Sequence, residues 1–181
     1  MSNYIRSKAP GAAYFFTAHL ADRNSTLLTD EINLLRHAMR CTLQRYPFEI
    51  DAIVILPSTI HTIWHLSEGD ADYSRRWSFL KSTFSRSLPV PEHRSALQKS
   101  RKEKGIWQRR FWEHKIRSAQ DLALHRNLVH TAPVQRGFVA TPSDWTWTSV
   151  HRDLADAHRA ANPAPPQRFS SFQRRARSPA A

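Results

Sequence analysis

The chain has a single cysteine and lacks any long hydrophobic run. One cysteine excludes an internal disulfide, and Cys41 lies in a helical pattern where a buried thiol is the simpler interpretation. No apolar stretch approaches the roughly 20 residues that a transmembrane helix needs, and the N-terminus has no secretory hydrophobic segment. These absences lead us to expect a cytoplasmic protein.

Acidic residues are also scarce. Asp and Glu number 15 against 27 Lys and Arg, which gives a formal charge of +12 and a pI of about 10.8. This imbalance favours a polyanionic partner, of which nucleic acid is the first candidate. A membrane surface attracts the same charge, but binding there usually requires a basic amphipathic helix with an apolar face. No segment has that pattern clearly, so we expect no membrane partner.

Hydrophobic periodicity predicts an alternation of strands and helices within one domain, residues 1–157. The expected strands are 14–20, 48–56, 59–66 and 105–116, and the expected helices are 29–46, 73–88 and 118–130. Pro57 and Ser58 leave room only for a tight antiparallel hairpin between the second and third strands. The order β-α-β-β-α-β followed by a helix is typical of an α+β, ferredoxin-like split βαβ sandwich with an antiparallel sheet.

Other segments are expected to lie outside long regular elements. Residues 89–105 contain two prolines and many cations, which predicts an exposed basic loop. Residues 133–139 are expected to form an exit turn, and 143–154 a short terminal helix or turn. No acid follows Asp156, and arginines there stand among Pro, Ala and Ser, which predicts a disordered basic tail over 158–181.

The basic loop and the strand after it supply candidate phosphate contacts. The strand 105–116 combines cations with aromatic rings, and we interpret the rings as core residues. For its two adjacent arginines, phosphate contact is the favoured interpretation over a merely solvated face. The candidates are Arg94, Lys99, Arg101, Lys102, Lys104, Arg109 and Arg110.

This strand, together with "NYIR", "PFEIDAIVILP", "GDADYSRRW" and "PVQRGFV", resembles the REP-associated tyrosine transposases, over residues 1–155. Members of that family are single-tyrosine HUH transposases, which use a ferredoxin-like domain to cut and rejoin single-stranded DNA near palindromic hairpins. The resemblance implies single-stranded or hairpin DNA as the partner. It also places "NYIR", with Asn3, Tyr4 and Arg6, against a short tetranucleotide beside the hairpin.

The family's catalytic set is incomplete in this sequence. In the family pattern, two histidines flanking one apolar residue hold a divalent metal, Mg²⁺ or Mn²⁺, while a tyrosine attacks the phosphodiester and a nearby amide completes the metal shell. The matching positions here are Thr59 and His61 for the histidines, Leu128 for the tyrosine and Ala132 for the amide. His65 cannot supply the missing imidazole, because four strand residues separate it from His61 by about 13 Å.

The resemblance therefore implies a vestigial half of a metal site, no bound cofactor and a DNA-binding protein without catalysis. Two alternatives stay open. An active transposase would need another nucleophile, such as Ser118 or Thr131, although neither has an evident activating base. An RNA-binding accessory protein is the other, although the sequence lacks the aromatic, Gly-rich strand signature of an RRM.

Overall fold

A computed structural model describes residues 9–91 and 94–161 of the chain. It has two compact units, of which the first ends at His151 and the second begins at Arg152. The elements are β1 (Ala13–His19), α1 (Leu27–Asp30), α2 (Ile32–Arg45), β2 (Phe48–Leu56), β3 (Thr59–Leu66), α3 (Tyr73–Arg86), α4 (Ala96–Ser100), β4 (Trp112–Lys115), α5 (Ala119–Gln135), the 3₁₀ turn η1 (Pro142–Asp144) and α6 (Val150–Ala161).

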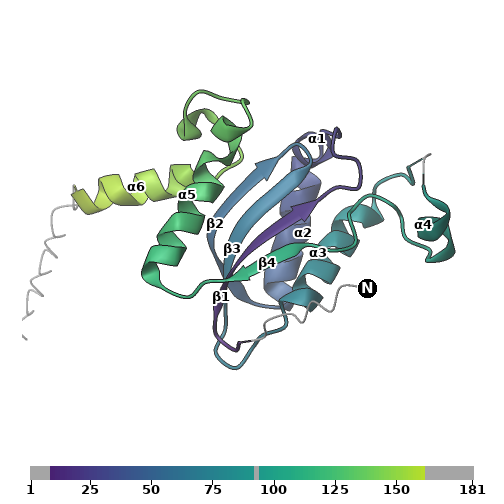
Figure 1. Ribbon diagram of the computed structural model, residues 1–181, viewed down its shortest axis with the longest axis horizontal. Helices are drawn as coiled ribbons and strands as arrows, with labels where there is room; N and C mark the ends of the chain where they lie inside the picture. The colour runs from purple at the N-terminus through teal and green to yellow at the C-terminus, as the bar shows by residue number, and fades with distance from the viewer. Residues whose placement is uncertain (1–8, 92–93, 162–181) are drawn as a thin grey trace, which may run out of the picture. The chain divides into compact units, whose positions relative to one another are not determined.

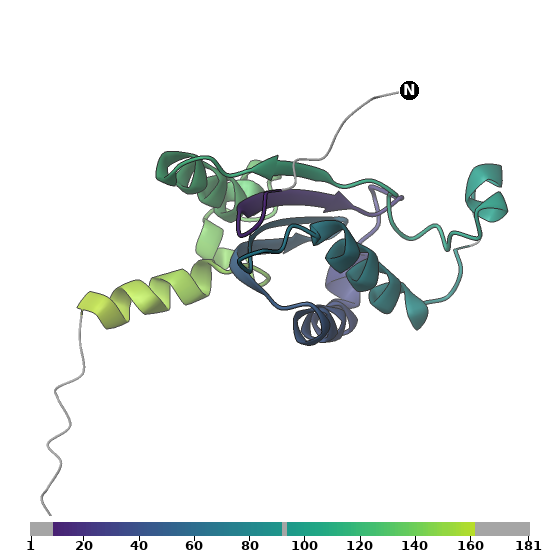
Figure 2. The same cartoon turned by 90° about the horizontal axis from the view of Figure 1, so that it is seen from below.

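The first unit is built on a four-stranded sheet with the order β2-β3-β1-β4. Every neighbouring pair is antiparallel, and only Pro57 and Ser58 link β2 to β3. Helices α2 and α3 lie against one face of this sheet and α5 against the other (Figures 1 and 2). The predicted ferredoxin-like α+β fold is therefore confirmed.

Strand alternation divides β1 between two cores. Tyr14 and Phe16 are fully buried on the side of α2 and α3, in a cluster that includes the stacked rings of Trp64 and Trp77, 4.6 Å apart. Phe15 faces the other way and packs with Ile63, Val129 and Ala132 in a smaller core beneath α5. The second core holds α5 against the sheet, and so sets where its C-terminal end lies.

The predicted fourth strand, 105–116, is wrong in its extent. Only Trp112–Lys115 pairs continuously with β1, while Trp107 makes an isolated bridge to Leu20. Continuing the β4 register would bring Leu20 opposite Arg109, so two additional residues are accommodated between the bridge and the strand. Arg109 and Arg110 consequently lie in an exposed irregular segment, not on a regular strand.

Other predicted boundaries also change. Helix α5 continues beyond His130 to Gln135 and includes the buried Pro133, although proline cannot donate a helical hydrogen bond. The expected basic loop contains α4, whose Ser95 forms a capping box with Gln98. Helix α6 includes residues 158–161, so the predicted tail begins within a helix; residues 162–181 lie outside the described part of the chain.

Candidate nucleic-acid interface

Two histidines and two threonines form a crossed arrangement on the α5 side of the sheet. The register of β1 and β3 places Thr17 opposite His61 and His19 opposite Thr59. In each pair the histidine Nδ1 lies 2.9 Å from the threonine Oγ1. The two imidazoles are therefore diagonal neighbours on adjacent strands, each held through one ring nitrogen.

Both imidazoles are held in the neutral form at physiological pH. Burial lowers the pKa of His61 from 6.5 to about 4, and the proximity of His19, Arg136 and Arg23 adds to the effect. Burial likewise lowers the pKa of His19 to about 4, with further contributions from Arg23, Arg136 and Lys81. A second proton, which would make either ring cationic, is thus disfavoured by desolvation and by the nearby positive charges.

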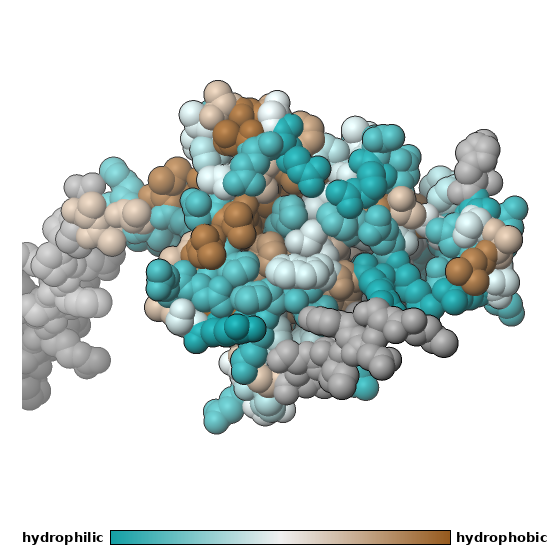
Figure 3. Space-filling view, viewed as in Figure 1, coloured by the Kyte–Doolittle hydropathy of each residue, from teal (hydrophilic) through white to brown (hydrophobic). Residues whose placement is uncertain are grey.

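Helix α5 brings Leu128 and Ala132 to this side of the sheet. Four residues apart, they share one helix face, but Ala132 is buried in the second core whereas Leu128 is 38% exposed. Arg136 follows one turn later as the C-cap residue of α5, near enough to the histidines to lower their pKa values. Hydrophobic side chains gather over α5 in the space-filling view (Figure 3), where Leu124 and Leu128 are the exposed leucines.

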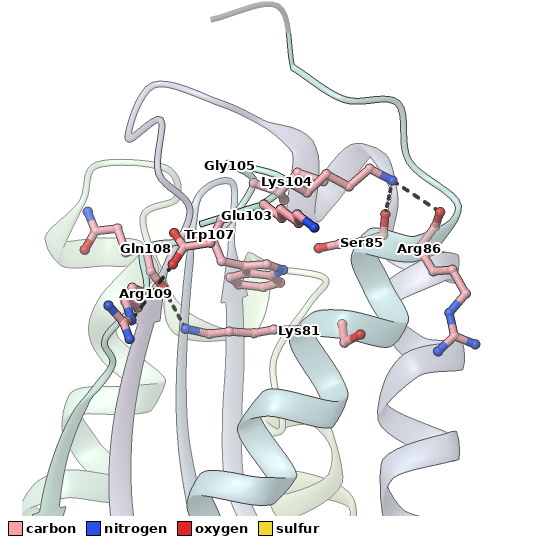
Figure 4. A pocket seen from close by; sticks show the side chains of 12 residues that line it. Lys81, Ser85, Arg86, Glu103, Lys104, Gly105, Trp107, Gln108 and Arg109 are labelled. Carbon is pink, nitrogen blue, oxygen red and sulfur yellow. Dashed lines mark hydrogen bonds and ion pairs between the residues drawn. The ribbon is translucent and has the colours of Figure 1, made fainter. Parts of the chain in front are cut away.

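A basic pocket lies beside the C-terminal end of β1, where α3 meets the segment before β4. Its volume is about 450 Å³. Its charged lining consists of Lys81, Arg86, Lys102, Lys104, Arg109 and the single acid Glu103 (Figure 4). Such an excess of cations around one opening suits a phosphate backbone.

Two of the predicted cations make hydrogen bonds within the protein. Lys104 donates to the backbone carbonyls of Ser85 and Arg86, at 2.6 and 3.2 Å, and thereby caps the C-terminal end of α3. Arg94 donates to the Glu103 carbonyl at 3.3 Å. The remaining five predicted contacts are exposed, and they are Lys99, Arg101, Lys102, Arg109 and Arg110.

An exposed aromatic ring adjoins the crossed histidines. Trp112 on β4 pairs with Thr17, which in turn pairs with His61, so the three side chains form one row across the sheet. The indole is 53% exposed, and its inner side contacts Phe15 and the His114 ring. A half-exposed indole that packs on two neighbouring rings is a suitable platform for an unpaired base.

Three further residues, His114, Asp121 and His125, lie within metal-binding distance of one another. Asp121 accepts from His114 Nε2 at 2.9 Å and from the Arg117 N–H, while His125 Nδ1 is 2.9 Å from the Asp121 carbonyl. The two imidazoles are stacked, 4.4 Å apart and 14° from parallel. Ring nitrogens bind metals in the plane of the ring, so two stacked rings cannot both coordinate one ion. We therefore interpret this cluster as a hydrogen-bond network.

Some sequence predictions fall outside this description. Asn3, Tyr4 and Arg6 of "NYIR" lie among residues 1–8, which are not described. Across the described ranges, 9–91 and 94–161, no helix has both the length and the apolar character to cross a membrane.

Comparison with known proteins identifies the family. No family model matches the chain. The chain is 42% identical over 155 residues to a REP-associated tyrosine transposase of Escherichia coli, and the match covers 86% of each protein. It is 47% identical over 156 residues to a Haemophilus influenzae protein assigned to the same transposases, and that match covers 85% of this chain and 88% of the relative. A solved REP-associated tyrosine transposase bound to a REP hairpin is 40% identical, with a TM-score of 0.76 and 87% of each chain covered.

This chain belongs to the REP-associated tyrosine transposases. Within that family its donor set does not fit Mg²⁺ or Mn²⁺. Such hard ions prefer carboxylate, carbonyl and water oxygens, often with imidazole for Mn²⁺. Here the family positions offer one imidazole (His61), a buried threonine hydroxyl (Thr59) and a methyl group (Ala132), and the charges that act on His61 are cationic.

Sequence reasoning missed His19. The alternation of residues 14–20 places its side chain on the same face as Phe15 and Thr17, but only the pairing of β1 with β3 brings it opposite Thr59. That pairing joins residues 40 positions apart. The pattern of the strand that contains His61 gives no sign of His19, because this neighbouring imidazole belongs to another strand.

Proposed function

We propose that this protein binds single-stranded or hairpin DNA of the palindromic-repeat type and does not cut it. The observation that carries the proposal is the 40% identity, over 87% of both chains, to a transposase solved with a REP hairpin. The basic pocket and the five exposed cations before β4 supply the charge that a phosphate backbone requires.

The absence of cutting follows from chemistry at the family's catalytic positions. A leucine at position 128 cannot attack phosphorus, and the four tyrosines of the chain are Tyr4, Tyr14, Tyr46 and Tyr73. Tyr14 and Tyr73 are fully buried in the main core. Tyr46 follows α2, on the α2–α3 side of the sheet, where it contacts Phe79 of the α3 region.

The alternative nucleophiles are engaged in structural bonds. Ser118 Oγ accepts from the Asp121 N–H as the N-cap of α5, and Thr131 Oγ1 donates to the Asn127 carbonyl at 2.8 Å. Neither hydroxyl is bonded to a histidine or carboxylate among the described residues, so neither has the base that an activated hydroxyl needs.

The proposal also includes recognition of specific bases and a cytoplasmic location. We assign tetranucleotide recognition to Asn3, Tyr4 and Arg6, since amide and guanidinium groups read base edges and a phenol can stack. A cytoplasmic location agrees with a DNA partner in a bacterial cell. RNA binding is the competing function, and matched DNA and RNA hairpins distinguish the two.

The test is a fluorescence-anisotropy titration with three probes of equal length: a palindromic DNA hairpin carrying a single-stranded flank, a scrambled DNA strand and the RNA version of the hairpin. We expect the DNA hairpin to bind most tightly. Tighter binding of the RNA hairpin, or no DNA binding at low salt, would refute the proposal. Deletion of residues 1–7 should reduce discrimination between hairpin and scrambled DNA more than it reduces total affinity.

A further inference from the structure

The crossed Thr–His pairs leave both imidazoles with the same unused atom. His19 and His61 each engage a threonine through Nδ1, and among the described residues no hydrogen bond involves either Nε2. Both side chains are only partly buried, so a ligand can reach these nitrogens. The site is therefore two Nε2 atoms on neighbouring strands of one sheet face.

The buried hydroxyl of Thr59 decides which nitrogen of His19 carries hydrogen. Thr59 is 1% exposed, and among the described residues its Oγ1 has His19 Nδ1 as its hydrogen-bond partner. A hydroxyl satisfies its hydrogen only by donating, so Oγ1–H donates to Nδ1 and the neutral ring carries its hydrogen on Nε2. The opposite tautomer would leave a buried hydroxyl hydrogen without an acceptor, which is unfavourable.

His61 has the same arrangement with Thr17, which is partly buried whereas Thr59 is fully buried. Thr17 Oγ1 has His61 Nδ1 as its partner at 2.9 Å, and donation by the hydroxyl again leaves an Nε2–H on the ring. A metal ligand must present a lone pair, whereas an Nε2–H presents a donor. In this arrangement both imidazoles are built to donate to an acceptor atom and not to coordinate a cation.

The surrounding charges favour the same kind of ligand. Arg23 follows β1, Arg136 caps α5 and Lys81 belongs to α3, and all three act on His19 as positive charges. A divalent cation placed between the imidazoles would be repelled by these groups, whereas an oxyanion would be attracted. Two N–H donors with guanidinium groups nearby match the non-bridging oxygens of a phosphate.

We infer that His19 and His61 together bind one phosphodiester of the DNA backbone directly, through their Nε2–H groups and without a metal ion. This inference rests on the proposed DNA binding and deepens it. It assigns a binding role to His19. It also means that the sheet face with His61 binds an anion and not a metal ion.

The first experiment measures anisotropy with the labelled hairpin and its single-stranded flank, in EDTA and in Mn²⁺. We expect equal affinity in both. His19→Leu and His61→Leu should each weaken binding several-fold, whereas His61→Gln, which retains an amide N–H donor but no imidazole, should lose less. His65→Leu is the matched control, because it removes an imidazole from the same face of β3 and should change affinity little.

The second experiment replaces the phosphates of the flank one at a time with neutral methylphosphonates. Wild-type protein should lose affinity at one linkage in particular, and the His19→Leu, His61→Leu double variant should lose nothing further there. Equal losses at that linkage in both proteins would overturn the inference, as would affinity that depends on Mn²⁺. A wild-type protein that binds no DNA at all would refute the proposed function together with the inference, whereas metal-dependent binding refutes the inference alone.

A third measurement needs no variant. Long-range ¹H–¹⁵N spectra of the wild-type protein in EDTA should show the Nε2–H tautomer for both histidines. Added Mn²⁺ should not selectively broaden their signals. The Nδ1–H tautomer, or selective broadening, would contradict the inference.

Discussion

Arg76 and Asp70 form an ion pair in which the guanidinium Nη2 lies 2.6 Å from the carboxylate Oδ2. Arg76 is 3% exposed, and its other donors reach the backbone carbonyls of Tyr46, Pro47 and Asp72. The segment "GDADYSRRW" thus joins the start of α3 to the turn between α2 and β2. Its second arginine is a structural residue, not a DNA contact.

Arg76→Met should lower the free energy of unfolding by about 3–5 kcal/mol, because it leaves three part-buried carbonyls and Asp70 Oδ2 without the donor that Arg76 supplies. Urea denaturation measures this change. Arg75→Met is the matched control: Arg75 is largely exposed and its contact with Asp72 is 3.4 Å, so its loss should cost less than about 1 kcal/mol. Equal losses for the two variants would contradict the structural role of Arg76.

Stability should fall as the pH decreases from about 6.5 towards 4. In the folded state the pKa values of His19 and His61 are about 4, below the ordinary 6.5 of the unfolded chain. The unfolded state therefore binds more protons within that window, and acidification favours it. The Asp70 and Asp121 carboxyls, whose pKa values lie below 3.8, contribute only at lower pH.

Urea denaturation at several pH values measures this dependence. His61→Gln removes one titrating group, so its stability should change less steeply over the window, by at most about 1.4 kcal/mol per pH unit. An unchanged slope in His61→Gln would show that His61 titrates normally in the folded protein.

Purified protein should neither cleave single-stranded DNA nor form a covalent adduct with Mg²⁺ or Mn²⁺, because Leu128 replaces the nucleophile. A denaturation-resistant protein–DNA band would refute this expectation. Combining Thr59→His, Leu128→Tyr, Ala132→Asn and His19→Ser should restore some cutting. The combination without His19→Ser should not, because His19 occupies the position directly opposite residue 59.

Binding should weaken with salt to an extent set by the five exposed cations. For single strands log K falls by about 0.7 per phosphate neutralised for each unit of log salt, so five contacts predict a slope of about −3.5. Replacing Arg109 and Arg110 with Ala should make the slope shallower by about 1.4. Lys104→Met should instead lower stability and leave the slope nearly unchanged, since its ammonium caps α3.

Trp112→Ala should weaken binding to single-stranded DNA by about 1–3 kcal/mol, the value of one stacked base, whereas Trp112→Phe should lose less. Anisotropy with oligonucleotides carrying an abasic site should show which base is involved. Leu124→Ala is the control, because Leu124 is similarly exposed on α5 but offers no ring. Equal effects of the alanine variants would indicate general apolar contact and not stacking.

The sequence predicts the fold well where the signal is local. Periodicity locates α3 and the β2–β3 hairpin, and the order of elements yields the sheet. Prediction from the sequence fails where contacts between distant segments determine the structure. The two extra residues before β4 are visible only through the Leu20–Trp107 bridge, and α5 continues through Pro133 past the expected end.

The residues of the candidate site also differ in whether local sequence is enough to predict them. Thr59, His61, Leu128 and Ala132 follow from motifs within short segments, so the sequence alone is enough to propose them. The role of Lys104 depends on the carbonyls at the end of α3, and that of His19 on strand register. Neither relationship is encoded near the residue itself, because hydrogen bonds between segments require the folded chain.

The crossed Thr–His pairs also limit which residues can be exchanged at position 59. A histidine there would lie directly opposite His19, where side chains are about 5 Å apart, and would remove the hydroxyl on which His19 depends. Positions 19 and 59 are therefore coupled across the two strands. A substitution that places a second imidazole beside His61 must be accompanied by a change at residue 19.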